Sequence, residues 1–172
     1  MLNRPLPDVL DLAKLAASMG AEVTVLSASR DKERDASRLG AKHFVATKEP
    51  RALDALQGSF DLIVDTVSAQ HDLNQPMALL HSYGTMVLLG LPPNATAATT
   101  INAGSLTFGN KRLAGSNIGG IQETQEMLDY GKKGVIADVE VIKAEQINDA
   151  YKRMQRGDVR YRFVIDLGSL EV

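Results

Sequence analysis

Cysteine is absent from this 172-residue chain, and tryptophan is absent as well. Without thiols the chain can form no disulfide, offers no thiolate nucleophile and cannot bind a metal ion through thiolate sulfur. A chain without cysteine fits a reducing compartment, so we expect the protein in the cytoplasm. Its three histidines, His43, His71 and His81, begin a strand or lie near helix ends, where we expect solvated or capping imidazoles.

The chain also lacks an excess of charge of one sign and any long apolar segment. Lys and Arg together number 19 and Asp and Glu number 21, so we expect no nucleic-acid partner. No apolar run approaches the ~20 residues that a membrane-spanning helix needs, and no signal peptide is expected, so we expect no membrane partner. The hydrophobic content of 44% is enough for one sizeable core, and we predict a single domain over residues 1–172.

The sequence is organised around the apolar run Phe60–Thr66 (FDLIVDT). Its three consecutive apolar residues are typical of a strand that is covered on both faces, as in parallel sheets. The run ends at Asp65, where polar side chains appear at the expected carboxyl end of the strand, and ligands of open α/β sheets bind at that edge. A second apolar run, Thr85–Leu89, follows after a helix-length gap and ends at Gly90.

Helical and strand-like segments alternate along the whole chain. We predict helices over residues 9–19, 50–56, 121–132 and 144–154, a charged helix from Ser29 or Asp31 to about Leu39, and one entered at Asn74. We predict strands over residues 22–27, 43–46, 60–66, 85–89, 113–118, 139–142 and 160–166, and a loop over 92–100. This alternation indicates the α/β class with a doubly wound, mainly parallel sheet.

These segments resemble the coenzyme-binding half of the medium-chain, zinc-type alcohol dehydrogenases, and most of all the cinnamyl alcohol dehydrogenase branch. The matching runs are LAKLAASMGAEVTVLS, RLGAKHFVAT, FDLIVDTVSAQHDLN, GTMVLLGLPP, LAGSNIGGIQETQEMLDY, DVEVIKAEQINDAYKRM and DVRYRFVID, in the family's order from about Leu10 onward. The resemblance implies a Rossmann-like fold with NADP(H) as cofactor. It also implies hydride transfer between the nicotinamide and an alcohol or aldehyde, with zinc polarising the oxygen in the full-length enzymes.

The chain departs from the family pattern in two respects. Relatives carry a first strand and a GxGGxG turn before the first helix, whereas this chain has Arg4–Val9 (RPLPDV) in that place. The two prolines remove backbone donors, and Asp8 and Asp11 put negative charge where a pyrophosphate would lie, although the same residues also suit an ordinary capped helix. The family's catalytic zinc domain is missing as well. We therefore expect a truncated Rossmann-like domain without its first central strand, and we assign no catalytic residue and no metal ligand.

The resemblance also implies the position of a cofactor site. After the strand over residues 22–27, hydroxyl and cationic side chains occur with no acid at the strand tip, which suits a 2′-phosphate; these are Ser27, Ser29, Arg30 and Lys32. Ala28 stands where relatives often carry arginine. The serines could equally cap a helix and the cations could be solvated.

Further residues match positions around the nicotinamide half of the cofactor. The positions along the nicotinamide and its ribose are matched by Thr66, Val67, Leu89, Gly90 and Leu91. The segment over the nicotinamide ring is matched by Ser116, Asn117 and Ile118. An arginine that reaches the pyrophosphate in relatives is matched by Arg160. Taken singly, each is equally well explained as a strand end, a turn glycine, an edge strand or a surface charge. Their joint order favours the site.

The segment Leu113–Ile118 resembles the edge strand through which family members dimerise. An exposed edge strand needs a partner or protection, so a homodimer through this strand is an expectation. Two functions remain open: the coenzyme-binding portion of an NADP(H)-dependent alcohol dehydrogenase or aldehyde reductase, or an inactive remnant or stand-alone module that self-associates. A short-chain-type reductase fits poorly, because none of the four tyrosines is followed by lysine at Tyr-x-x-x-Lys spacing.

Overall fold

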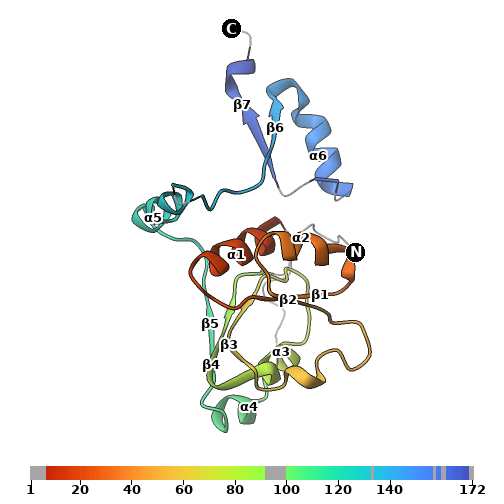
Figure 1. The fold of residues 1–172 in the computed structure, drawn as a ribbon, viewed down its shortest axis with the longest axis vertical. Coiled ribbons are helices and arrows are strands. Elements are labelled where there is room, and N and C mark those ends of the chain that lie inside the picture. The colour runs from red at the N-terminus through yellow and green to blue at the C-terminus, as the bar shows by residue number, and fades with distance from the viewer. Residues whose placement is uncertain (1–6, 92–99, 133, 157, 160–161, 171–172) are drawn as a thin grey trace. The chain divides into compact units, whose positions relative to one another are not determined.

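The computed structural model describes residues 7–91, 100–132, 134–156, 158–159 and 162–170, with side chains from residue 11 onward (Figure 1). Its contacts divide the chain into two compact units. Unit 1 comprises Met1–Val25, Asp31–Phe44 and Thr124–Val172, and unit 2 comprises Leu26–Arg30 and Val45–Glu123. Each unit is described by itself. No helix in the described ranges is both long enough and apolar enough to cross a bilayer.

Unit 2 is built on a three-stranded sheet in the order β3-β4-β5 (Figure 1). The strands are β3 (Phe60–Asp65), β4 (Leu80–Leu88) and β5 (Arg112–Gly115), and both pairings are parallel. The register places Asp65 opposite Leu88, and Leu88 opposite Gly115. The carboxyl ends of all three strands therefore meet at one edge of the sheet.

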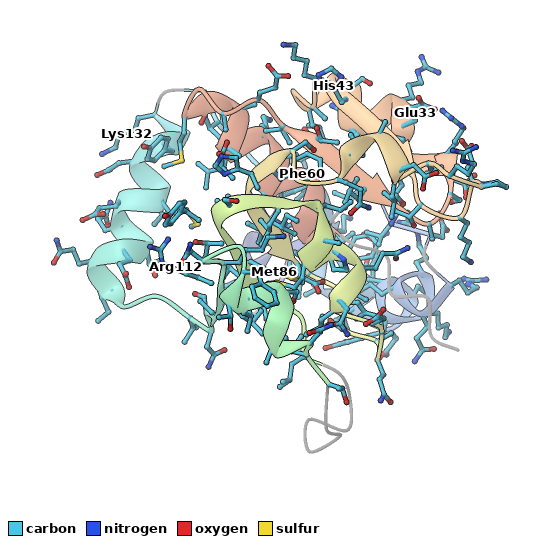
Figure 2. The ribbon with its side chains drawn as sticks, turned by 90° about the horizontal axis from the view of Figure 1, so that it is seen from below. Glu33, His43, Phe60, Met86, Arg112 and Lys132 are labelled. Atoms are coloured by element: carbon cyan, nitrogen blue, oxygen red, sulfur yellow. The ribbon has the colours of Figure 1, made fainter. Side chains whose placement is uncertain are left out.

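The core of unit 2 lies between this sheet and two short helices, α3 (Asn74–Leu79) and α4 (Ala103–Thr107). Its most deeply buried members include Met77, Leu80 and Met86, the last of which is labelled in Figure 2. Ile63 of β3 packs against this cluster, but its neighbour Leu62 is 58% exposed. The expected cover on both faces of β3 is therefore not found within the part of the chain that the structure describes.

Unit 1 has a smaller core formed by α1 (Pro7–Ser18), α2 (Glu33–Arg38) and the first half of the strand β1 (Thr24–Ser27), whose last two residues belong to unit 2. Alanines and small aliphatic residues make up this core: Ala13, Val25, Ala36, Leu39 and Ala41. Gly40 ends α2 at a φ of +99°, and a Cβ there would lie 2.9 Å from the Ala17 Cβ of α1. A glycine at this point therefore allows both the left-handed turn and the close approach of the two helices.

The remaining elements are strands and helices of unit 1, the strand β2 and four short 3-10 helices. Unit 1 also contains most of α5 (Ile121–Gly131), and β6 (Glu140–Lys143), α6 (Ile147–Arg156) and β7 (Phe163–Asp166), with β6 and β7 parallel. β2 (His43–Ala46) pairs with β1. Four 3-10 helices complete the described elements: η1 (Arg30–Lys32), η2 (Asp54–Leu56), η3 (Ala144–Gln146) and η4 (Leu167–Ser169).

The strands pair in three groups, β1-β2, β3-β4-β5 and β6-β7. Among the described strands, β1 has only β2 as a neighbour and β3 has only β4. β1 and β3 are therefore not paired with each other in the described chain. Every pairing whose register is determined is parallel, as expected for the α/β class.

Most expected elements are confirmed to within a few residues, and three differ. The helix expected over residues 50–56 is reduced to η2, and β4 begins at Leu80, five residues before the expected Thr85. The helix α4 was not predicted. β5 ends at Gly115, so Ser116, Asn117 and Ile118 follow the strand instead of belonging to it. The expected loop falls largely outside the described residues, as does the start of the last strand.

Candidate functional site

Asp65 connects the ends of β3 and β4. It is a buried charged residue, 8% exposed, and its carbonyl oxygen accepts hydrogen bonds from the backbone N–H groups of Leu89, at 2.8 Å, and Gly90, at 3.1 Å. Its carboxylate Oδ1 accepts a bond of 2.9 Å from the backbone N–H of Val67. One residue thus fixes the strand end, the following loop and the end of the neighbouring strand at the edge where ligands of such sheets bind.

The other carboxylate oxygen of Asp65 is paired with His71. The distance from His71 Nε2 to Asp65 Oδ2 is 2.7 Å, and the ring's Nδ1 lies 2.9 Å from the carbonyl oxygen of Ala69. Partial burial of the ring works against protonation, but the bonds to Ala69 and Asp65 and the charge of Asp72 outweigh it, so the pKa of His71 is raised. The expectation of a solvated or capping imidazole at His71 is therefore wrong, because the loop folds the ring back onto the strand end.

The structure brings Thr66, Val67, Leu89 and Gly90 together at the ends of β3 and β4. A Cβ on Gly90 would lie 2.3 Å from the Val67 carbonyl oxygen and 2.7 Å from the Thr66 carbonyl carbon, so no larger residue fits without movement. Val67, Leu89 and Leu91 expose apolar side chains. The edge therefore offers an apolar surface over a tightly bonded backbone, and we call these residues, Thr66–Val67 and Leu89–Leu91, the rim.

The segment after β5 starts at the same edge of the sheet. The backbone N–H of Ser116 donates a 3.0 Å hydrogen bond to the carbonyl oxygen of Leu88. Asn117 and Ile118 follow it on the surface, and the Ile118 side chain is 87% exposed. The structure thus places Ser116 beside the end of β4, while no described hydrogen bond joins Asn117 or Ile118 to the rim.

The residues expected to hold a 2′-phosphate lie after β1. The Ser27 carbonyl oxygen accepts a 2.7 Å bond from the N–H of Thr47, which ties the end of β1 to the end of β2. Arg30 forms a two-pronged ion pair with Glu49: Nε lies 2.6 Å from Oε1 and Nη2 lies 2.8 Å from Oε2. This hydrogen bond is the main cause that lowers the pKa of Glu49. A carboxylate therefore already engages the guanidinium in the fork geometry that a phosphate would use.

Lys32 belongs to unit 1 and is only partly exposed. Burial is the largest influence on its ammonium group and lowers the pKa of Lys32, while the neighbouring Asp31 carboxylate acts in the opposite direction. An ammonium group that has lost part of its hydration gains more than a fully solvated one from a bound anion. Ser29 is exposed and has a partner of its own, and Arg160 lies outside the described residues.

Three residues of the site, Asp65, His71 and Glu49, were not named as candidates from the sequence. The sequence predicts the position of Asp65 at the end of a strand, but it does not predict that the side chain is buried. For His71 the signal was its place six residues after a strand-ending carboxylate, which is too weak to use alone. For Glu49 no signal exists, because its partner lies 19 residues away on the loop after another strand.

A hollow of about 640 Å³ opens at the other end of the unit 2 sheet, beside Leu80, Ser82 and Lys111 at the starts of β4 and β5. It contains none of the candidate residues. The hydrogen bonds at the carboxyl ends of the strands, not this hollow, therefore define the site.

Comparison with known proteins identifies the family of the chain. Residues 11–133 match the family model described as zinc-binding dehydrogenase. The chain is 51% identical over 158 residues to the NADP-dependent alcohol dehydrogenase C of Mycobacterium tuberculosis, a match over 91% of this chain and 45% of the relative. Alcohol dehydrogenase 9 of Catharanthus roseus is 49% identical over 91% of this chain and 43% of its own length.

Solved structures give the same result. A cinnamyl alcohol dehydrogenase of Sorghum bicolor superposes with a TM-score of 0.82 at 38% identity, over 92% of this chain and 45% of that one. A cinnamyl alcohol dehydrogenase of Helicobacter pylori complexed with NADP(H) superposes with a TM-score of 0.74 at 32% identity, again over 92% and 45%. The chain belongs to the zinc-binding dehydrogenase family and has the Rossmann-like fold of its coenzyme-binding half. It spans slightly less than half the length of these relatives.

The residues of this chain do not fit the zinc ion in the family description. The sequence contains no cysteine, and in the described ranges no three side chains of histidine, aspartate or glutamate gather in a way that could hold a metal. His71 is engaged with Asp65, and His43 Nε2 lies 3.0 Å from Glu22 Oε1. We therefore derive no reaction step through a metal.

Proposed function

We propose that this chain is the coenzyme-binding portion of an NADP(H)-dependent alcohol dehydrogenase or aldehyde reductase. In this proposal it holds the dinucleotide from which, or to which, hydride passes at an alcohol or aldehyde carbon. The observation that carries the proposal is the rim: two backbone segments fixed by Asp65 at the carboxyl ends of parallel strands, where dinucleotides bind in this class of fold. Two similar proteins are named for NADP or were solved with NADP(H), which supports the choice of coenzyme.

The rim residues have a binding and orienting role in this proposal. The exposed apolar side chains of Val67, Leu89 and Leu91 suit the face of a planar nicotinamide, and backbone groups at Thr66 and Gly90 suit its ribose and amide. Ser116, Asn117 and Ile118 would cover the ring from the neighbouring strand end. The fixed rim would keep the reactive carbon in one place, which is the protein's main contribution to hydride transfer.

The 2′-phosphate would bind after β1. Ser27 and Ser29 offer hydroxyl groups, and Arg30 offers a guanidinium that is paired with Glu49. Lys32, which belongs to the other unit, is proposed from its sequence position alone. Arg160 is proposed for the pyrophosphate from its sequence position alone. Since Arg4–Val9 replaces the glycine-rich turn, the pyrophosphate has fewer backbone donors, and we expect weaker binding than in relatives that keep the turn.

Titration of the purified chain with NADPH and NADH, followed by calorimetry or by nicotinamide fluorescence, tests the proposal. We expect saturable binding with NADPH preferred over NADH, and we expect no consumption of NADPH with an aromatic aldehyde unless a second polypeptide supplies the electrophile. Equal affinity for the two nucleotides, or no binding at millimolar concentration, would count against the proposal. Clear turnover by the chain alone would overturn its catalytic part.

A second candidate is a self-associating module without catalytic activity. It is favoured by the edge of β5, which has only β4 as a strand neighbour in the described chain, and by the exposure of Ile118 and Ile121 beyond it. We propose homodimerisation through Leu113–Ile118. Light scattering behind size-exclusion chromatography should give twice the monomer mass, and Ile118→Glu should restore the monomer; a monomer at all concentrations contradicts this candidate.

A further inference from the structure

An ion pair between Asp65 and His71 closes the loop between β3 and α3. The family assignment gives this pair no role. Asp65 ends β3, His71 lies six residues later, and the two rim residues Thr66 and Val67 lie between them. The Asp65 carboxylate uses one oxygen for the Val67 N–H and the other for the His71 ring. The pair therefore fixes the backbone of the rim from both ends of the loop.

The geometry around the ring requires a charged imidazole. Nε2 faces a carboxylate oxygen at 2.7 Å and Nδ1 faces the carbonyl oxygen of Ala69 at 2.9 Å. Both oxygens only accept hydrogen bonds, and a neutral imidazole carries a single N–H. Both bonds can therefore form at once only in the imidazolium, and the neutral ring must give up one of them.

Loss of that proton affects the rim because the Asp65 carboxylate is buried. Its side chain is 7% exposed, so water cannot replace a lost donor at low cost. The backbone carbonyl of Asp65 accepts hydrogen bonds from the N–H groups of Leu89 and Gly90. A shift of Asp65 is therefore transmitted to both segments of the rim.

Among the described residues, three groups act on the ring: the carboxylates of Asp65 and Asp72, and the Ala69 carbonyl. Asp72 is itself held by Asn74 at the start of α3, whose backbone N–H and Nδ2 donate to Asp72 Oδ1 at 2.9 and 2.8 Å. All three groups favour the charged ring, and only its partial burial opposes them.

We propose that His71, as an imidazolium paired with Asp65, is a positioning residue of the coenzyme site, and that loss of its proton loosens the rim and weakens dinucleotide binding. The statement about dinucleotide binding rests on the proposed function. The statements about the protonation state of His71 and the order of the loop are independent of it. The direction in pH follows from the pairing. Because the native loop favours the charged ring, its contribution is complete below the ordinary histidine value of about 6.5 and is lost as pH rises through the higher native value.

The test combines NMR of the histidine rings with binding. In the wild-type chain labelled with 15N-histidine, we expect the His71 ring to keep protons on both nitrogens to a higher pH than an unpaired histidine would. NADH is the better ligand for the pH series, because it lacks the 2′-phosphate, whose own ionisation changes near pH 6. NADH affinity should fall roughly tenfold from pH 6 to pH 9, the size of one charge-assisted hydrogen bond.

Two variants separate positioning from general stability. His71→Gln keeps one donor without the charge, and should show the weakened affinity at pH 6 and little further change up to pH 9. His81→Gln alters an exposed ring at the start of β4 and should keep the wild-type pH profile. A wild-type profile for His71→Gln, or a His71 ring that is neutral at pH 6, overturns the inference.

If the chain binds no dinucleotide, the proposed function fails, but the effect of His71 on the order of the loop can still be tested. Amide exchange at Val67 and Gly90, corrected for the intrinsic pH dependence, should then lose protection as His71 deprotonates. Constant protection of both amides across that range would overturn the positioning role. This readout uses the unmodified chain, so it remains decisive even if His71→Gln does not fold.

Discussion

Gly90 passes so close to Val67 that a Cβ on residue 90 would lie 2.3 Å from the Val67 carbonyl oxygen. The contact joins the loops after two neighbouring strands, and it lies beside the hydrogen bonds that Asp65 makes to Leu89, Gly90 and Val67. Backbone atoms at this distance cannot be moved apart by rotating a side chain. The shape of the rim therefore depends on the absence of a side chain at one position.

Replacement of Gly90 by alanine should destabilise the fold by about 1–3 kcal/mol, the usual cost of forcing extra atoms into a filled space. Urea unfolding followed by circular dichroism measures the change. Gly115→Ala is the matched control at the end of β5, since a Cβ there meets nothing within 4 Å. Equal stability of the two variants would show that the loops separate freely.

Tyr83 has a φ of +68° within β4 and is 64% exposed, so its backbone is strained and its side chain contributes little packing. Asparagine tolerates the left-handed region better, and Tyr83→Asn should stabilise the chain by about 1 kcal/mol. Thermal unfolding should show a higher Tm. Tyr151→Asn is the control: this exposed tyrosine lies in helix α6, where asparagine relieves no backbone strain, so this variant should not raise the Tm. A lower Tm for Tyr83→Asn would contradict the strain argument.

The Glu49 carboxylate competes with a phosphate for Arg30. Both side chains are about half exposed, so the ion pair is screened, and we expect Glu49→Gln to raise the preference for NADPH over NADH by only about threefold. Calorimetric titration with both nucleotides gives the ratio. Glu22→Gln, which alters an exposed carboxylate that pairs with Lys42, should leave the ratio unchanged. A gain that survives in the Arg30→Gln, Glu49→Gln double variant would show that Arg30 is not involved.

The stability of the chain should depend on pH through His71. Its raised pKa means that the native state binds the proton more tightly than the unfolded state, so the stabilisation is present at pH 6 and is lost as pH rises through the native value. The difference in unfolding free energy between the wild type and His71→Gln should therefore shrink from pH 6 to pH 9. Urea unfolding across this range checks the sign, and a difference that grows with pH would contradict it.

Local sequence features were sufficient for much of the fold. The apolar run that ends at Asp65 and the run that ends at Gly90 predicted β3, the C-terminal part of β4 and the edge at which their ends meet. The sequence did not predict the short helix α4 or the early start of β4 at Leu80. Both depend on the packing of Leu80 and Leu106 into the unit 2 core, which no local pattern encodes.

By itself, the sequence determined the α/β class, the family and the order of the residues along the rim, because strand periodicity and chain order are local properties. Tertiary structure alone decided that Asp65 is buried, that His71 turns back onto it and that Glu49 engages Arg30. These pairings depend on where loops from different strands meet, and distances of a few ångströms between such loops are set by packing, not by any pattern of neighbouring residues.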